Sequence, residues 1–336
     1  MAEKISVLGA GSWGSALAIL AARNGCQTLL WGHDANHIHD LQRLRKNQRY
    51  LPDIAFPDNL LLSAQLEQAA TFADVLLVCV PSQAFKATLE RLKPHLSSTT
   101  AIAWATKGFN PDDGRLLHEI VAEVFSPETP AAILSGPSFA REVAIGLPTA
   151  ITLAANRIEF AEHLAKVFHN TCFRVYTSDD VIGVEVGGAV KNVLAIAAGI
   201  ADGLGFGANT RSALITRGLN EVIRLGLCLG GKQDTFMGLA GLGDLILTCT
   251  DNQSRNRRLG IALGQGIAFA DAVAAIGQEV EGVAAARETY ALAQKFAIDM
   301  PITEQTYKVL YQGLKPKLAV ENLLAREIKR ECLHLS

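Results

Sequence analysis

The sequence predicts a two-domain α/β protein, with a doubly wound, mainly parallel sheet over residues 1–178 and an all-α domain over residues 179–336. A chain of 336 residues is long for a single hydrophobic core. Short apolar runs alternate with helical patterns through the first half, as expected for a parallel sheet with helical crossovers. At Ser178-Asp179-Asp180 an N-cap cluster appears, and only helical patterns follow it.

The strands of the first domain are expected to be continuous apolar runs, because parallel strands are buried on both faces. They cover residues 5–8, 28–31, 74–80, 100–106, 131–134, 149–154 and 172–175. Residues 35–46 predict a polar helix, residues 48–59 a loop, and Pro81-Ser82 a helix start. In such sheets ligands bind beyond the carboxyl ends of the strands, where Lys107 and Ser138 are expected.

The second domain is expected to contain only helices. They are predicted over residues 179–201, 210–229, 255–264, 269–275, 281–296 and 303–312, with one more near the C-terminus. The first of them is the most apolar, but it contains Glu185, Lys191 and Asn192 and is therefore a poor membrane span.

The composition predicts an ordinary soluble globular protein, with 49% hydrophobic and 19% charged residues. A formal net charge of -2 argues against nucleic acid or an anionic membrane as the main partner, so an anionic substrate needs a local basic site. The six cysteines are scattered without a C-x-x-C pair, which indicates reduced thiols in the cytoplasm and no disulfide or metal framework. The first strand begins so close to Met1 that no signal peptide is expected.

A glycine motif at the start of the chain predicts a dinucleotide-binding site. Gly9, Gly11 and Gly14 have the spacing G-x-G-x-x-G, with an apolar strand before them and a helical pattern after them. Gly9 allows the tight turn, Gly11 lets a pyrophosphate approach the backbone, and Gly14 lets the helix lie against the strand. The first N–H groups of that helix would face the phosphates. The alternative is a plain strand-to-helix turn, but the context favours a Rossmann-type domain.

The end of the second strand bears on cofactor choice. NAD-specific sites usually place an acidic residue there, on the ribose 2′-hydroxyl. This chain has His33, with Asp34 one place later. Because histidine tolerates a 2′-phosphate, the sequence favours NADP(H), or use of both NADP(H) and NAD(H). The alternative is that His33 is an exposed turn residue.

Lys191 is a candidate proton donor. It lies in the middle of an apolar helix, where an unpaired charge is costly. Desolvation and a nearby cation would lower its pKa toward neutrality, which suits general acid catalysis. The alternative is a lysine whose ammonium extends to the surface.

Asp244 lies between the glycines of Gly241-Leu-Gly243 and an apolar run. Its carboxylate could orient a lysine or accept a hydrogen bond from a substrate hydroxyl. A helix cap or a buried ion pair explains the same spacing equally well.

The segment Ser254-Arg255-Asn256 predicts an anion site. Ser254 is a plausible N-cap, so Arg255 and Asn256 fall in the first turn of a helix, where a cation opposes the helix dipole. A phosphate could use the arginine and the helix N–H groups together. A solvated basic turn is the alternative.

Six motifs occur in the order found in bacterial-type NAD(P)-dependent glycerol-3-phosphate dehydrogenases, and the chain resembles that family over nearly its whole length. They are Gly9–Gly14, Ala105–Gly108, Ser135–Ser138, Ala189–Asn192, Gly241–Asp244 and Ser254–Asn256. The resemblance implies dinucleotide contacts from Ser12, Trp13, His33, Lys107, Ala140, Arg255, Val280 and Glu281, besides the three glycines. It implies a substrate site of Lys107, Gly136, Ser138, Lys191, Asp244, Ser254, Arg255 and Asn256.

The function implied by the resemblance is reversible reduction of dihydroxyacetone phosphate to sn-glycerol 3-phosphate with NADPH or NADH, feeding glycerophospholipid synthesis. Lys191 would transfer the proton, Lys107 would steady the developing charge, and a cytoplasmic homodimer is implied. A β-hydroxyacid-type dehydrogenase is a competing interpretation, but its substrate carboxylate would need a different anchor from Ser254–Asn256. A non-catalytic dinucleotide sensor is another, although a sensor would need none of Lys107, Lys191 and Asp244.

Overall fold

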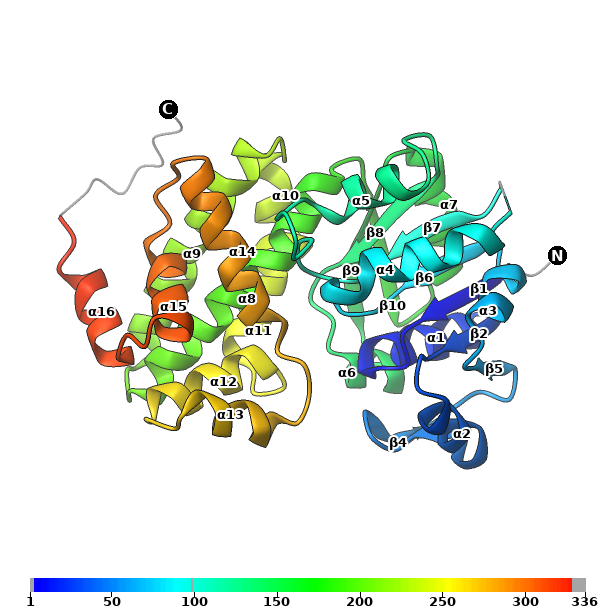
Figure 1. The fold of residues 1–336 in the computed structure, drawn as a ribbon, viewed down its shortest axis with the longest axis horizontal. Helices are drawn as coiled ribbons and strands as arrows, with labels where there is room; N and C mark the ends of the chain where they lie inside the picture. The colour runs from blue at the N-terminus through cyan, green and yellow to red at the C-terminus, as the bar shows by residue number, and fades with distance from the viewer. Residues whose placement is uncertain (1–2, 98, 328–336) are drawn as a thin grey trace. The chain divides into compact units, whose positions relative to one another are not determined.

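The computed structural model describes residues 3–97 and 99–327, and it separates the chain into two compact units (Figure 1). The first unit runs up to Thr106 and resumes over Leu117–Val181. The second consists of Lys107–Leu116 together with the chain from Ile182 onward. The sequence placed residues 107–116 in the first domain, whereas their contacts group them with the second unit. The boundary at 178/179 stays a prediction.

An eight-stranded sheet forms the centre of the first unit, in the order β10-β9-β8-β7-β6-β1-β2-β5. Its strands are β1 (Lys4–Leu8), β2 (Gln27–Trp31), β5 (Leu60–Ser63), β6 (Val75–Val78), β7 (Ala101–Trp104), β8 (Ala131–Ser135), β9 (Thr149–Ala155) and β10 (Phe173–Ser178). Neighbouring strands are parallel except β8 and β9, which are antiparallel. The mainly parallel sheet is therefore confirmed.

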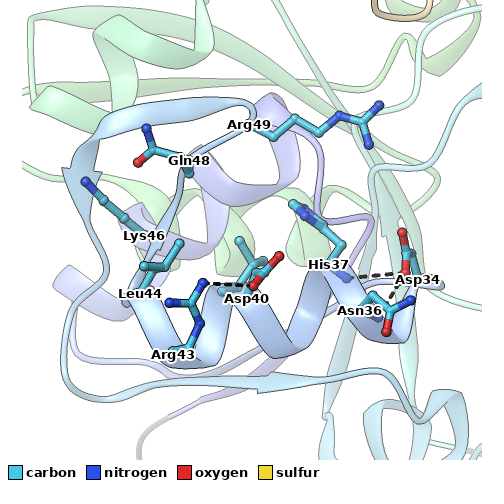
Figure 2. Close-up of a pocket in the computed structure, with 10 residues that line it drawn as sticks. Asp34, Asn36, His37, Asp40, Arg43, Leu44, Lys46, Gln48 and Arg49 are labelled. Atoms are coloured by element: carbon cyan, nitrogen blue, oxygen red, sulfur yellow. Dashed lines mark hydrogen bonds and ion pairs between the residues drawn. The ribbon is translucent and has the colours of Figure 1, made fainter.

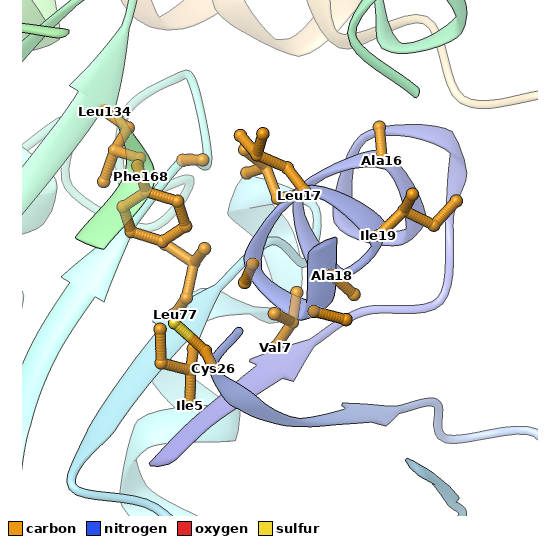
Figure 3. Close-up of a cluster of buried hydrophobic side chains, with 14 of the residues drawn as sticks. Ile5, Val7, Ala16, Leu17, Ala18, Ile19, Cys26, Leu77, Leu134 and Phe168 are labelled. Carbon is orange, nitrogen blue, oxygen red and sulfur yellow. The ribbon is translucent and has the colours of Figure 1, made fainter. Parts of the chain in front are cut away.

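Two groups of helices pack with this sheet. In one group α1 (Ser12–Arg23) contacts α6 (Ala140–Ile145) and α7 (Ile158–Phe168). In the other, α4 (Ser82–Leu92) contacts α3 (Leu66–Phe72) and α5 (Leu117–Val124), with the short 3₁₀ turn η1 (Lys93–His95) after α4. Side chains of α1, β1 and β6 meet Phe168 of α7 in a buried cluster (Figure 3). Its burial fixes the position of the glycine turn that joins β1 to α1.

One predicted loop of the first unit is wrong. Residues 48–59 include β4 (Leu51–Ala55), which pairs antiparallel with β3 (Lys46–Asn47), and β5 follows at Leu60. Pro52 disfavoured a strand there, but a two-stranded ribbon leaves one edge unpaired and tolerates proline at that edge. The preceding helix, α2 (Ala35–Leu44), ends two residues earlier than predicted, and its C-cap is Arg45 with φ 49°.

The second unit is helical, apart from the segment Lys107–Leu116, among the residues that the structure describes. Its helices are α8 (Val181–Gly203), α9 (Ala208–Cys228), α10 (Gln233–Met237), the π-helical turn η2 (Leu239–Gly243), α11 (Asp244–Thr250), α12 (Arg255–Gly264), α13 (Phe269–Ile276), α14 (Glu281–Lys295), α15 (Pro301–Tyr311) and α16 (Pro316–Leu324). The all-α prediction is thereby confirmed, although the sequence did not predict α10, η2 and α11.

Helix α8 is the central, mostly buried helix of this unit. It is long and apolar enough to cross a membrane, yet 89% of its most apolar window is buried inside the protein, as in the core helix of a globular domain. Glycines let α12 approach it closely. A Cβ on Gly199 of α8 would clash with the carbonyl oxygen of Arg257, and a Cβ on Gly260 of α12 would clash with that of Ile196. The two helix backbones therefore touch, and no side chain fits between them.

Candidate active site

The glycine turn of the first unit has the geometry that a dinucleotide phosphate requires. Gly9 has φ 123°, and a Cβ there would lie 2.7 Å from the carbonyl oxygen of Cys79. At Gly11, by contrast, a Cβ would meet nothing within 4 Å. Packing within the protein therefore does not require a glycine at position 11, which agrees with the close approach of a ligand. Helix α1 starts there without a side-chain cap or an acidic residue in its first turn, so its N–H groups remain available to an anion.

Two side chains form polar contacts with the backbone of this turn. The Asn47 amide donates to the carbonyl oxygen of Ala10 at 3.0 Å and to Ser15 Oγ at 2.8 Å. His37 Nε2 lies 3.2 Å from the same carbonyl oxygen. Asn47 is completely buried, which explains why the short β3 strand is kept against the turn. The predicted contact residue Trp13 has a buried Nε1 without a hydrogen-bond partner among the described residues.

After β2, the side chain of His33, and not that of Asp34, is available to contact a ribose substituent. Asp34 caps α2, and its Oδ1 accepts hydrogen bonds from the backbone N–H groups of Asn36 at 2.9 Å and His37 at 3.2 Å. The hydrogen bond from His37 is the main cause that lowers the pKa of Asp34. His33 is exposed. A polar pocket lies beside this cap, between α2 and residues 46–49, but none of the predicted site residues lines it (Figure 2).

The other predicted residues of the first unit follow β8. Gly136 lies against β9, where a Cβ would come within 3.0 Å of the Cα of Ile151. Ser138 Oγ donates to the carbonyl oxygen of Gly136 at 2.9 Å. Ala140 begins α6, which packs on α1. The buried hydroxyl of Ser135, just before them, has no partner among the described residues.

In the second unit, the structure brings the three predicted catalytic residues together. Asp244, which is 1% exposed, accepts from both lysines: Lys107 Nζ lies 2.6 Å from its Oδ2, and Lys191 Nζ donates to its Oδ1. Lys191 also donates to Thr248 Oγ1 at 3.0 Å, and that hydroxyl donates to the carbonyl oxygen of Asp244 at 2.6 Å. Lys191 is only 6% exposed, so its ammonium does not extend to the surface.

The charges of this cluster set the pKa of Lys191. Burial lowers the pKa of Lys191, the negative charge of Asp244 raises it, and the positive charge of Lys107 lowers it, and together these effects bring it to about 8. Burial alone would raise the pKa of Asp244, but attraction to Lys107 and Lys191 outweighs it, so the pKa is lowered. Asp244 therefore stays ionised, and Lys191 can give up a proton near neutral pH.

The predicted anion site is tied to this cluster through Asn192. Asn256 Nδ2 donates to Asn192 Oδ1 at 2.9 Å, and Asn256 Oδ1 accepts from the backbone N–H of Gly282 at 2.9 Å. These two hydrogen bonds bring the start of α12 to Lys191 on one side and to Val280 and Glu281 on the other. Asn192 Nδ2 is buried without a partner among the described residues, so it is a polar group available to a ligand.

Helix α12 begins as predicted. Ser254 is its N-cap, with Oγ accepting from the backbone N–H of Arg257 at 3.2 Å. Arg255 follows at the first helical position, partly exposed and without a hydrogen-bond or ion-pair partner among the described residues. A cation at a helix N-terminus is unfavourable unless an anion shares the site, which supports a phosphate there.

The sequence interpretation left out Asn192 and Thr248 as site residues. Thr248 lies one helical turn after Asp244, so helical spacing was a usable signal for it, whereas Asn192 is adjacent to Lys191 and has no such spacing. Among the described residues, no group of three or more His, Cys, Asp or Glu side chains could hold a metal ion.

Comparisons with known proteins identify the family. The family model for the N-terminus of NAD-dependent glycerol-3-phosphate dehydrogenase matches residues 4–161, and the model for its C-terminus matches residues 180–321. The glycerol-3-phosphate dehydrogenase [NAD(P)+] of Aeromonas hydrophila is 57% identical over 328 residues, covering 97% of this chain and 98% of the relative. That of Pseudoalteromonas translucida is 56% identical with the same coverage.

Solved structures agree with these relatives. The crystal structure of glycerol-3-phosphate dehydrogenase from Coxiella burnetii has a TM-score of 0.94 at 50% identity, covering 97% of this chain and 99% of that one. The yeast enzyme has a TM-score of 0.81 at 26% identity, covering 96% and 99%. The fold, the chemistry of the buried cluster and these relatives lead to one conclusion: the chain belongs to the NAD-dependent glycerol-3-phosphate dehydrogenase family and is an NAD(P)-dependent oxidoreductase.

Proposed function

We propose that the chain reversibly reduces dihydroxyacetone phosphate to sn-glycerol 3-phosphate, with Lys191 as the proton-transfer residue. The observation that carries this proposal is the buried contact of Lys191 with Asp244, beside Lys107. When bound, NAD(P)H supplies a hydride to the ketone carbon. Lys191 gives its proton to the carbonyl oxygen, where negative charge develops, and Lys107 stabilises that charge. Asp244 keeps both ammonium groups in place. In the reverse direction, neutral Lys191 accepts the hydroxyl proton.

The glycine turn, Ser12, Trp13, His33 and Ala140 would bind the dinucleotide, together with Lys107, Arg255, Val280 and Glu281. Gly136, Ser138 and the Ser254–Asn256 turn would bind the substrate along with Lys107, Lys191 and Asp244. Holding the phosphate at Arg255 and Asn256 converts remote binding energy into orientation of the carbonyl group. We further propose a cytoplasmic homodimer whose product feeds glycerophospholipid synthesis, with NADP(H), or both NADP(H) and NAD(H), as the cofactor.

The test is to follow NADPH absorbance while the protein is mixed with candidate ketones. Consumption with dihydroxyacetone phosphate alone supports the proposal. Turnover only with a keto acid or semialdehyde acid would favour a β-hydroxyacid-type dehydrogenase, and no turnover with any ketone would favour a dinucleotide sensor.

Arg255→Ala is expected to reduce kcat/KM for dihydroxyacetone phosphate by the equivalent of about 2–4 kcal/mol, because a charge-assisted phosphate contact is lost. Dihydroxyacetone has no phosphate, so its weak turnover should show little further loss. Arg258→Ala, which removes an exposed arginine of the same helix, is the matched control and should affect neither substrate. Similar losses with both substrates at saturating NADPH would mean that Arg255 acts through the cofactor or through folding, and not through the substrate phosphate.

His33→Asp is expected to raise KM for NADPH much more than KM for NADH, because the new carboxylate would repel a 2′-phosphate. Steady-state kinetics with each cofactor measure the two effects. His39→Asp makes the same charge change on the exposed face of α2 and should leave the ratio of the two KM values unchanged. An equal rise for both cofactors would place His33 outside the ribose pocket.

A further inference from the structure

Arg257, in the first turn of α12, is buried although its neighbours Arg255 and Arg258 are not; it is 7% exposed. Its guanidinium uses all three nitrogens. Nε donates to the carbonyl oxygen of Cys249 at 3.1 Å, Nη1 contacts Asn252 Oδ1, and Nη2 lies 2.6 Å from Asp202 Oδ2. One side chain therefore joins the end of α11, the loop before Ser254, and α8.

These three segments carry Lys191, Asp244 and the Ser254–Asn256 turn of the candidate substrate site. Helix α8 carries Lys191, α11 carries Asp244, and the loop after α11 leads into Ser254–Asn256. Asp202 is itself held in place, because both of its carboxylate oxygens lie 3.0 Å from Arg211 Nη1. The backbone of Arg257 also meets α8 directly, at Gly199. Arg257 is thus fixed at both its main chain and its guanidinium.

The two arginines of this turn, Arg255 and Arg257, have different environments. Residues two apart on a helix point in directions about 160° apart around its axis. Arg257 accordingly points inward to an ion pair in which its side chain is 9% and that of Asp202 11% exposed. Arg255 has no partner among the described residues. An ion pair removed from water is favourable only when its geometry is well satisfied, and here every guanidinium nitrogen has an acceptor.

We propose that Arg257, held by Asp202, is a positioning residue that sets the Ser254–Asn256 turn at the correct place for the substrate phosphate. Arg257 does not touch the substrate in this proposal; it acts by fixing the end of α11, the loop 251–254 and the first turn of α12. The inference rests on the proposed phosphate role of Ser254–Asn256. It predicts that loosening Arg257 weakens recognition of the phosphate group while leaving the chemistry at the carbonyl group intact.

The experiment measures kcat and KM of Arg257→Lys, Arg257→Met and Asp202→Asn, each with dihydroxyacetone phosphate and with dihydroxyacetone. Lysine keeps the charge but cannot join three segments. We expect kcat/KM for dihydroxyacetone phosphate to fall by about 10–10²-fold, mostly through KM, because a small misplacement of a binding group has effects of that size. The value for dihydroxyacetone should change by less than about threefold, and NADPH affinity should be retained.

Glu221→Gln is the control for general destabilisation, since Glu221 is also buried but accepts hydrogen bonds from Ile302 and Thr303. Its kcat/KM values for the two substrates should fall together or not at all. If Arg257→Met does not fold, Arg257→Lys and Asp202→Asn carry the test. The proposal is overturned if those variants lose both substrates equally, as the control would, or lose neither. Failure of the phosphate site itself would be recognised separately, because Arg255→Ala would then not distinguish the two substrates either.

Discussion

Lys191→Met is expected to lower kcat by about 10²–10⁴-fold, the range for loss of a positioned general acid and some stabilisation of the developing oxyanion. Methionine keeps the aliphatic bulk of the side chain. Asp244 still has Lys107 at 2.6 Å, so the substitution does not leave a buried carboxylate unpaired. Because Lys191 contributes no atom to the glycine turn, NADPH binding, measured by fluorescence, should survive.

The pH dependence of this variant is a second readout. Reduction needs protonated Lys191, whose pKa is lowered to about 8, so kcat/KM of the unaltered enzyme should fall as the pH rises through that value. The variant should lack this basic limb. Because the pKa of Lys191 is lowered from 10.5 in the folded state, its ammonium destabilises the folded protein. This penalty is fully present below about pH 8 and is absent from the variant. The melting temperature should accordingly hold or rise.

Lys308→Met is the matched control, since Lys308 pairs with Glu304 on a partly exposed helix face. It should leave kcat unchanged. Near-normal turnover of Lys191→Met would overturn the catalytic role, and a collapsed melting temperature would make Lys191 a structural member of an ion-pair network.

Gly260→Val is expected to reduce the free energy of unfolding by about 3–5 kcal/mol, at the upper end of single-residue effects. The new Cβ would meet the carbonyl oxygen of Ile196, and would lie 2.8 Å from the backbone nitrogen of Ile200 and 2.9 Å from the Cα of Gly199. Backbone atoms cannot rotate away as a side chain can, so α8 and α12 would have to separate. Urea unfolding of the full-length protein, monitored by circular dichroism, measures the loss in the free energy of unfolding.

Gly207→Ala is the control for this substitution. A Cβ at Gly207 would meet nothing within 4 Å, and its φ of -90° is open to any residue. The free energy of unfolding should fall only by the effect of a changed N-cap, about 1 kcal/mol or less. Equal unfolding free energies for the two variants would show that the contact between α8 and α12 yields easily to a larger side chain.

Local chemistry explains what the sequence predicted correctly. Helix α12 was predicted over 255–264, and the structure has Arg255–Gly264 with Ser254 as its cap, because an N-cap hydroxyl and its hydrogen bond depend on only a few residues. Strands such as β6 and β7 were equally visible, since each is a continuous buried apolar run, whereas β5 was not predicted.

Long-range pairing explains what could not be predicted. The contacts of Asp244 with Lys107 and Lys191 join residues 137 and 53 positions apart, and no local pattern encodes such a partner. The pairing of β3 with β4 was missed because sheet contacts outweigh the local signal of Pro52. Arg257 looked like one more charge in a basic turn, and only its contacts with Cys249, Asn252 and Asp202 distinguish it from Arg258.

The assignment of Lys107–Leu116 to the helical unit has a consequence for inheritance. The gene encodes that unit in two pieces, with residues 117–181 between them. Recombination between two homologous genes near codon 178 would join the Lys107 of one parent to the Asp244 of the other. Mutations that have accumulated together around this pair would then be separated. Exchanges that keep codons 107–244 from a single parent preserve the pair, so viable natural and laboratory chimeras should be depleted in crossovers between those codons.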